Sequence, residues 1–421
     1  GAPAFWQRIA AGYYEHIRSF HVEKTNYKST LHACYLGYIT QALIVNLPPL
    51  LFIVFREKFG LSFTMLGSLV LIVFVTQLIV DAAAVKIVDR IGYRASAIIA
   101  HAFAAVGMLA CAFLPRIMPQ PYSGLIIASI LYAIGGGLIE VLVSPIVESL
   151  PGEAKASSMS LLHSFYSWGQ VLVVALSTIA LVLIGQDLWF VLPLAWAVLP
   201  IITLIKFIHV PLMPQEEESK RTPLKTLLTS RIFLIAILLM ICSGAAEQAM
   251  AQWASLFAEK GLGISKTLGD LLGPCLFAVM MGIARTLYGV KGQKINMHKT
   301  LVFSSVMCIL SFAITALVPV PAIALIGCSL CGLSVSLMWP GMLSLTAAGY
   351  PSGGTAMFAL MALGGDLGCS IGPQLTGIIA DQSSLNLGLL AAVVFPAVML
   401  IGLMVLKPML FPKHGADSPQ Q

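Results

Sequence analysis

Long uninterrupted apolar runs are the feature that most limits how this chain can fold. Of its 421 residues, 58% are hydrophobic and 10% are charged, whereas a soluble protein keeps about 25% charged residues to wet its surface. About 20 apolar helical residues cross the hydrocarbon core of a bilayer. Because backbone polar groups in lipid must be satisfied within the segment, runs of this length favour membrane-spanning helices. The sequence therefore predicts an all-α membrane protein.

Twelve runs are candidate spans, and the short loops between them make neighbouring spans antiparallel. The candidates are 30–55, 63–85, 94–115, 122–147, 157–184, 188–209, 231–258, 266–290, 299–318, 321–346, 355–380 and 384–407. One long polar stretch, from Pro211 to Ser230, divides them into six and six. We therefore predict five parts: an N-terminal segment at 1–29, a six-helix bundle at 30–209, a linker at 210–230, a second six-helix bundle at 231–412 and a tail at 413–421.

The basic residues predict the orientation, since cytoplasmic loops of membrane proteins carry an excess of Lys and Arg. With the N-terminus in the cytoplasm, 19 of the 24 Lys and Arg residues fall on the cytoplasmic side. Both termini are therefore expected in the cytoplasm. The net charge of +6 is then a topology signal, and no soluble basic domain suggests a nucleic-acid partner. Residues 5–20 predict either a helix lying on the membrane surface or a solvated tail.

Two loops six spans apart share a spacing. The loop after the second span reads Asp89-Arg90-x-Gly92-x-Arg94, and the loop after the eighth contains Gly292-x-Lys294. The distance from the Gly to the following basic residue is the same, and both loops lie on the same side. The halves therefore look like copies related by an axis along the membrane normal, with a solute site between them.

The Asp89–Arg94 loop resembles the signature between spans 2 and 3 of the major facilitator superfamily. Within that superfamily the chain resembles the fucose permease branch of proton-coupled sugar symporters. The matching positions are Glu140, Pro145, Gly169, Trp253, Arg285, Pro340, Ser344, Leu345, Gly364, Gly365, Pro373, Gly377 and Asp381. The resemblance implies the major facilitator fold and secondary transport by alternating access. It also implies that the loop stabilises one of the two open states.

One departure from that branch lies in the first span, where fucose permease has an acid. Residues Gln41 to Pro49 contain none. Conversely, Glu247 and Asp366 are acids that the fucose permease pattern does not supply.

Three acids near midspan are candidates for proton coupling: Glu140, Glu247 and Asp366. A charge at the bilayer centre costs at least ~2.5–3.5 kcal/mol, so such residues face the interior of the protein. No Lys or Arg is expected near midspan, Arg285 being the nearest, toward the cytoplasmic side. An acid without a cation in a low-dielectric site favours its protonated form. The competing interpretation is a helix–helix hydrogen bond from a permanently neutral acid.

Polar and aromatic residues recur at helical spacing on several spans and predict a solute site. Its members are Tyr38, Gln41, Asn46, Glu140, His163, Tyr166, Gln248, Gln252, Trp253, Trp339 and Asp366. Amides, hydroxyls and aromatic faces suit a neutral polyol, and His163 is the pH-sensitive member. For each polar residue taken singly, interhelical hydrogen bonding is the competing interpretation.

A second set is predicted to gate the cytoplasmic side. Asp81 and Arg285 lie one to two turns from the cytoplasmic loops, where ion pairs between the halves would close that side. Together with the loop, the set is Asp81, Asp89, Arg90, Gly92, Arg94 and Arg285.

The function predicted first is proton-coupled symport of a neutral sugar or sugar-like solute. A proton-driven exporter of an apolar drug or metabolite is the alternative, and an anion transporter is disfavoured because the midplane lacks a basic residue. The sequence has no nucleotide-binding loop, HExxH or GxSxG, so we predict no enzyme activity. No cofactor is expected, and no metal, because Cys328 and Cys331 lack a second ligand pair. We expect a monomer in the plasma membrane, a bacterial inner membrane, with solute, protons and lipid as its partners.

Overall fold

The computed structural model describes residues 27–61, 63–151, 155–213, 222–258, 263, 271–292 and 295–410. Within these ranges every regular element is a helix. Most of the N-terminal segment, with the predicted surface helix at 5–20, lies outside the described residues. So do the middle of the linker and the tail at 413–421.

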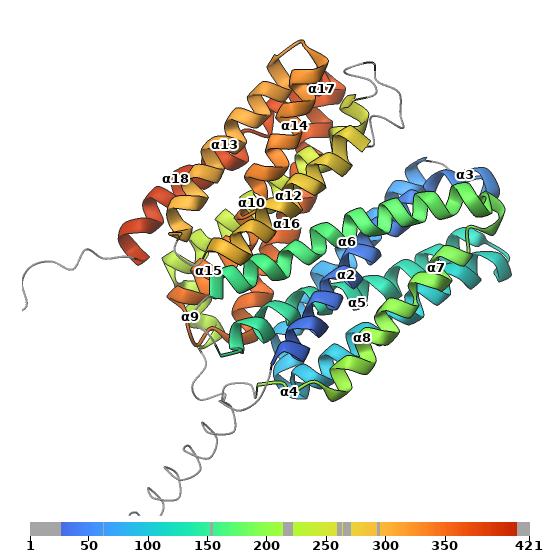
Figure 1. Ribbon diagram of the computed structural model, residues 1–421, viewed down its shortest axis with the longest axis horizontal. Helices are drawn as coiled ribbons and strands as arrows, with labels where there is room; N and C mark the ends of the chain where they lie inside the picture. The colour runs from blue at the N-terminus through green and yellow to red at the C-terminus, as the bar shows by residue number, and fades with distance from the viewer. Residues whose placement is uncertain are drawn as a thin grey trace, which may run out of the picture.

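The helices gather into two bundles on either side of the linker, coloured blue to green and yellow to red in Figure 1. The N-terminal bundle contains α2 (Lys28–Leu50), α3 (Phe52–Phe59), α4 (Phe63–Ile117), α5 (Pro121–Ser149), α6 (Lys155–Ile184), η1 (Gln186–Leu188), α7 (Val191–Trp196) and α8 (Val198–His209). The C-terminal bundle contains α9 (Leu224–Thr229), α10 (Arg231–Leu256), η4 (Leu271–Cys275), α12 (Leu276–Lys291), α13 (Met297–Leu317), α14 (Pro321–Val335), α15 (Met338–Gly349), α16 (Gly354–Gln382), α17 (Leu385–Ala391) and α18 (Val394–Leu410).

Ten helical segments in the described part of the chain are long and apolar enough to cross a membrane. They coincide with the third to the twelfth predicted spans. The first two predicted spans fall on α2 and the first part of α4, which are helical but are not among the ten, so the count of twelve stays a prediction. Large apolar side chains such as Ile79 and Leu183 are exposed, at 65% and 78%, as lipid-facing residues would be.

Proline and glycine interrupt the long helices where the backbone requires it. The first span breaks at Leu51, directly after Pro48 and Pro49, because proline removes helical hydrogen bonds. Gly92 turns α4 with φ +83°, a left-handed conformation that glycine adopts readily. Gly292, at the corresponding place in the second loop, has φ −77°. The two loops therefore share their position in the bundles but not their backbone conformation.

Small residues let α10 and α16 pack at backbone distance. A Cβ atom at Gly368 would lie 2.0 Å from the carbonyl oxygen of Ile241, and one at Gly372 would lie 2.3 Å from that of Ala245. Such close approach, with small residues four apart, is typical of helix pairs in membranes.

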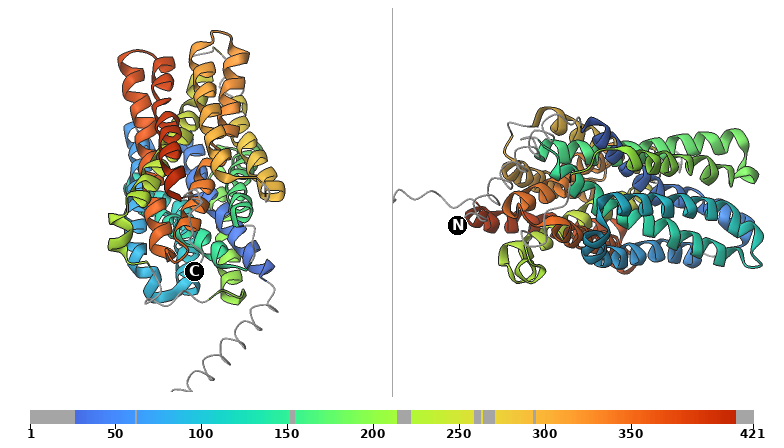
Figure 2. Two further views of the ribbon diagram at one scale, coloured as in Figure 1. Left: turned by 90° about the vertical axis from the view of Figure 1, so that its left-hand side faces the viewer. Right: turned by 90° about the horizontal axis from the view of Figure 1, so that it is seen from below.

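The two bundles touch mainly through α6 against α12 and through α4 against α16. We call the side where α2 begins, α4 turns at Gly92 and α8 ends the basic side. From there the axes of the bundles diverge toward the side that carries α3 and α17 (Figure 1). Figure 2 shows the same helices from two further sides. Hydrogen bonds cross between the bundles, among them Ser160 Oγ to the carbonyl oxygen of Arg285 at 2.8 Å and Trp168 Nε1 to Thr286 Oγ1 at 2.9 Å. Near the basic side, Thr355 Oγ1 donates to Tyr93 OH at 3.4 Å.

Candidate functional site

A small polar cavity of about 60 Å³ lies between the bundles. This volume admits only one or two water molecules, each of which occupies about 30 Å³ in the liquid. The lining residues come from both bundles: Tyr38, Gln41, Val45, Phe74, Gln77, Glu140, His163, Tyr166, Glu247, Gln248, Arg285, Trp339, Asp366 and Cys369. Ten of the predicted solute-site, coupling and gating residues are therefore brought together here.

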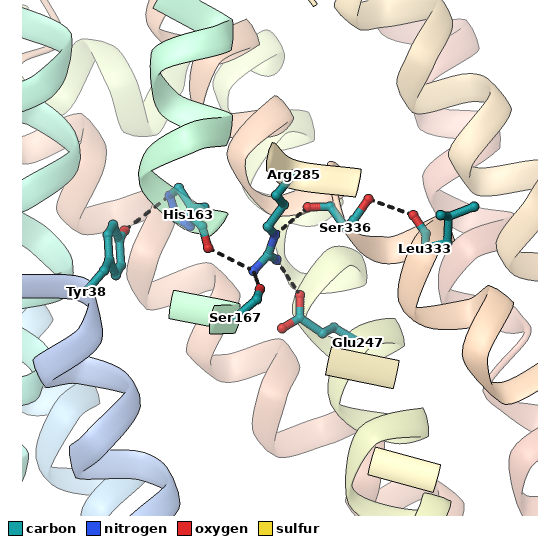
Figure 3. A network of polar contacts seen from close by, with 7 residues as sticks. All are labelled: Tyr38, His163, Ser167, Glu247, Arg285, Leu333 and Ser336. Carbon is teal, nitrogen blue, oxygen red and sulfur yellow. Dashed lines mark hydrogen bonds and ion pairs between the residues drawn. The ribbon is translucent and has the colours of Figure 1, made fainter. Parts of the chain in front are cut away.

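Arg285 on α12 connects the two bundles at the cavity wall (Figure 3). Its Nη2 atom pairs with Glu247 Oε2 on α10 at 3.1 Å. Its Nη1 atom donates to Ser167 Oγ on α6 at 2.9 Å and, at 3.4 Å, to the carbonyl oxygen of His163. Arg285 is 2% exposed and Glu247 is 8% exposed, so each buried charge has an opposite charge beside it, as buried charges require.

The fourth partner of Arg285 depends on a proline in a different helix. Arg285 Nε donates to the carbonyl oxygen of Ser336 at 2.7 Å. In a continuous helix that carbonyl would accept from the residue four positions on, but that residue is Pro340, which has no N–H. The chain breaks between α14 and α15 at this point, and the guanidinium takes the vacated acceptor.

This placement differs from what the sequence predicted for Arg285. It was expected nearer the cytoplasmic end, with no basic residue near midspan. The side chain instead reaches the central cavity, because its acceptors on α10, α6 and the 335–338 break all lie there. The sequence disfavoured an anionic solute because no basic residue was expected near midspan. That argument fails because Arg285 reaches the cavity, although Glu247 already neutralises the charge of Arg285.

Tyr38, Ser144 and His163 form a buried hydrogen-bonded group within the N-terminal bundle. Tyr38 OH lies 3.1 Å from Ser144 Oγ and 3.1 Å from His163 Nε2. The ring centroids of Tyr38 and His163 are 4.7 Å apart. This group joins α2, α5 and α6 along one wall of the cavity and offers hydroxyl and imidazole groups to it.

Three further acids lie at or beside the cavity without a basic partner among the described residues. Glu140 Oε2 accepts from Gln41 Nε2 at 3.1 Å. Asp366 is 4% exposed and Asp81 is fully buried. The carboxyl groups of Asp81 and Asp366 are near enough to interact with each other and with Glu140. Asp81 thus lies deeper than a gate at the loops would require.

The sequence matches the family model of the Major Facilitator Superfamily over residues 34–373, which is more than half of the chain. This chain belongs to the major facilitator superfamily. The superfamily consists of transporters, so the predictions of a transport protein and of no enzyme activity are confirmed. The protein is therefore a multi-pass membrane protein.

Solved structures of superfamily members agree with this assignment. The FucP transporter in its outward conformation is 16% identical, with a TM-score of 0.77 over 91% of this chain and 99% of its own. A single-residue variant of the E. coli fucose–proton symporter FucP is 17% identical, with a TM-score of 0.76 over the same shares. The proton–xylose symporter XylE, bound to 6-bromo-6-deoxy-D-glucose, is 13% identical, with a TM-score of 0.79 over 91% and 95%. At these identities the likeness concerns the fold. No curated protein sequence matches this chain.

Three predicted solute-site residues are not among the cavity-lining residues. Asn46 Nδ2 donates to the carbonyl oxygen of Ala42 at 2.8 Å, one turn back in its own helix. Trp253 Nε1 donates to the carbonyl oxygen of Pro373 at 3.1 Å and thereby joins α10 to α16. Gln252 is exposed. Asn46 and Trp253 therefore make a helical and an interhelical contact, and Gln252 is not part of the cavity wall.

The predicted gating loop contacts the end of α8 through Arg94. Arg94 donates through Nη1 to the carbonyl oxygen of Phe207 at 2.8 Å and through Nη2 to that of Val210 at 2.9 Å. These carbonyls end α8, where a cation is favoured by the helix dipole. Arg90 is exposed beside it and Asp89 is half-buried. The turn at Gly92 therefore ties the second and third spans to the sixth.

Gln77 is a cavity residue that the sequence analysis missed. It lies on α4, is 1% exposed and lines the cavity. The available signal was its position four residues before Asp81, which places both side chains on one helix face.

A second, larger cavity of about 630 Å³ opens between the bundles at the basic side. Glu148 and Lys155 line it from the N-terminal bundle, and Asn296, Ser344 and Tyr350 line it from the C-terminal one. Lys155 Nζ donates to the backbone carbonyls of Glu148 and Leu150 at the end of α5.

Proposed function

We propose that this protein is a secondary active transporter that works by alternating access and carries a neutral sugar or sugar-like solute together with protons. The observation that carries the proposal is the composition of the central cavity. Both bundles contribute hydrogen-bonding and aromatic side chains to it, and acids without a basic partner lie beside them. The sugar–proton symporters among its structural neighbours support the same choice.

The residues of the cavity divide into two roles in this proposal. Tyr38, Gln41, Gln248 and Trp339 bind the solute, since amides and hydroxyls match sugar hydroxyls and an aromatic ring suits an apolar C–H face. Glu140 and Asp366 exchange the proton, because neither has a cation beside it in the part of the chain that the structure describes. Glu247 is committed to Arg285, so we assign it to the structure of the site rather than to the proton.

The central cavity must widen to receive a sugar, because about 60 Å³ holds little more than water. Parting of the bundles provides that room. Gly365 illustrates how closely the site is filled, since a Cβ atom there would lie 2.1 Å from Trp339 Cη2. The indole therefore lies directly against the backbone of α16, one residue from Asp366.

The remaining assignments complete the proposal. The bundles are residues 30–209 and 231–412, and the protein has twelve spans with both termini in the cytoplasm. It works as a monomer in the plasma membrane, the inner membrane of a bacterium. Cysteine accessibility at positions 220 and 413 in intact cells checks the topology, and reagents reaching them from opposite sides of the membrane would refute it.

The deciding experiment is uptake of labelled solutes into proteoliposomes containing the purified protein. The panel includes neutral sugars, polyols, sugar acids and an apolar dye, each with and without an imposed proton gradient. We expect a neutral sugar or polyol to accumulate only with the gradient, and a protonophore to abolish the accumulation. Accumulation of the sugar acid alone would refute the neutral solute. Proton-driven movement of the dye alone would establish the exporter in its place.

A further inference from the structure

Asp81 and Asp366 meet where the two bundles are in contact. Asp81 belongs to α4 and Asp366 to α16, and these helices form one of the two main contacts between the bundles. Asp81 is 0% exposed and Asp366 is 4% exposed. One buried carboxyl group from each bundle therefore lies on this pair of helices, and the two groups are near enough to interact.

Three of the four oxygens of these two carboxyl groups lack a hydrogen-bond donor among the described residues. Within the described residues, Asp81 Oδ1, Asp81 Oδ2 and Asp366 Oδ2 are buried without a partner. Two ionised carboxylates can only accept, so contact between them provides no bond. If one carboxyl is protonated, its O–H donates to the other, and this bond gives one oxygen of each group a partner. The contact between these side chains is a hydrogen bond only in that form.

Among the described residues, no cation pairs with these two acids in place of the proton. Glu140 is the other ionisable group that faces Asp81, and it adds negative charge. Arg285, which lines the same cavity, directs its guanidinium to Glu247, Ser167 and the carbonyl oxygen of Ser336. Two buried carboxylates side by side cannot both be ionised at low cost.

We propose that Asp81 and Asp366 together form a binding site for one proton that spans the two bundles. This inference rests on the proposed proton coupling and adds Asp81 to it. The site exists only while the bundles touch near the basic side. When they part there, water hydrates each carboxylate separately and the shared proton is released toward that side. Proton release thereby follows from the opening movement itself.

Asp→Asn substitutions separate this role from a merely structural one. In Asp81→Asn the side-chain amide can donate to Asp366, so the hydrogen bond between α4 and α16 is kept while the titrating group is lost. Asp187→Asn is the matched control. Asp187 is an exposed acid that pairs with Lys58 far from the contact between the bundles.

Infrared difference spectroscopy between acidic and alkaline buffer detects the shared proton without any solute. We expect the wild type and Asp187→Asn to lose the same protonated-carboxyl band on alkalinisation. Asp81→Asn and Asp366→Asn should each lack one component of that band, and the double variant should lack no more than either single one. A band unchanged in Asp81→Asn would overturn the proposal. So would losses in the single variants that add in the double variant.

Transport in proteoliposomes supplies the second readout, with a solute that the wild type accumulates. In Asp81→Asn we expect uphill accumulation to fall about tenfold or more. Two strongly interacting groups change each other's proton affinity by more than about one pK unit, which is a factor of about ten. Solute counterflow should persist. Accumulation at the wild-type level in Asp81→Asn would overturn the shared proton site. If the wild type ignores the proton gradient while the infrared result holds, the coupling proposal fails and the proton site stands.

Discussion

At the scale of single residues, the buried charges divide into one that is paired and several that are not. The guanidinium of Arg285 has Glu247 beside it at 3.1 Å, and two neutral acceptors complete its contacts. Glu140, Asp81 and Asp366 have no such partner among the described residues. Paired charges hold a site together, whereas unpaired acids are free to gain and lose a proton.

Removing Arg285 should expose the cost of an unpaired buried charge. Arg285→Gln leaves Glu247 alone, and we expect the free energy of unfolding to fall by about 3–5 kcal/mol, seen as a lower melting temperature in detergent. The double variant Arg285→Gln with Glu247→Gln should recover much of that loss. Lys58→Gln, which breaks an exposed pair, is the control and should change little. Equal melting of Arg285→Gln and wild type would contradict the buried pair.

Glu140 is the residue on which proton coupling in the N-terminal bundle can be tested. Glu140→Gln imitates the protonated acid and can still accept from Gln41. We expect uphill accumulation to cease while solute exchange remains measurable, because the two open states no longer differ in protonation. Glu148→Gln, two turns along α5, should accumulate solute normally. Continued accumulation in Glu140→Gln would move the coupling to other acids.

Sequence reasoning found most of the cavity, because helical spacing determines which side chains share a face. It placed Tyr38 with Gln41 and identified Glu140 and Asp366 as interior acids. It could not determine depth or partners on other helices. The position of Arg285 depends on a carbonyl 51 residues further along the chain, which Pro340 leaves free, and that contact exists only in the folded bundle.

At the scale of elements, close packing of α10 on α16 positions the acids of the C-terminal bundle. Gly244, Gly368 and Gly372 bring the two backbones together, and a Cβ atom at Gly244 would lie 2.3 Å from the carbonyl oxygen of Gly365. This contact fixes Glu247 on one helix relative to Asp366 on the other. The glycine spacing was visible in the sequence, but the partner helix was not.

Two glycines of α16 provide a matched test of that packing. Gly368→Ala would place a methyl group 2.0 Å from the carbonyl oxygen of Ile241. This oxygen belongs to the backbone, so no side-chain rotation can relieve the clash. We expect a destabilisation of about 1–3 kcal/mol, measured by thermal unfolding in detergent. Gly364→Ala meets the side chain of Ile237 first, at 3.2 Å, and should be tolerated. Similar melting temperatures for the two variants would argue against the close packing.

At the scale of the whole molecule, the alternating access that we propose requires the bundles to part at the basic side. The contact of Thr355 with Tyr93 lies there, at 3.4 Å. Cysteines at these two positions, joined by a short bifunctional thiol reagent, should hold the bundles together. We expect turnover to fall about tenfold or more, since opening movements set the rate of many cycles, while solute still binds from the opposite side.

Each single cysteine variant, treated with the same reagent, is the control for this tether. The native cysteines are buried apart from Cys275, which is half-buried, so the reagent should act mainly at the introduced positions. Unchanged turnover in the tethered protein would mean that the basic side does not open between α4 and α16.

The partners of Arg285 have a consequence for the energetics of that movement. Glu247 and Ser336 belong to the same bundle as Arg285, whereas Ser167 and the carbonyl oxygen of His163 belong to the other. When the bundles separate, the guanidinium exchanges two uncharged acceptors for water and keeps its carboxylate. No opposite charges are pulled apart at this contact. The rate of the movement should therefore be insensitive to ionic strength. Dissolved salt weakens the attraction between charges that separate, but it has little effect on an ion pair that stays intact during the movement.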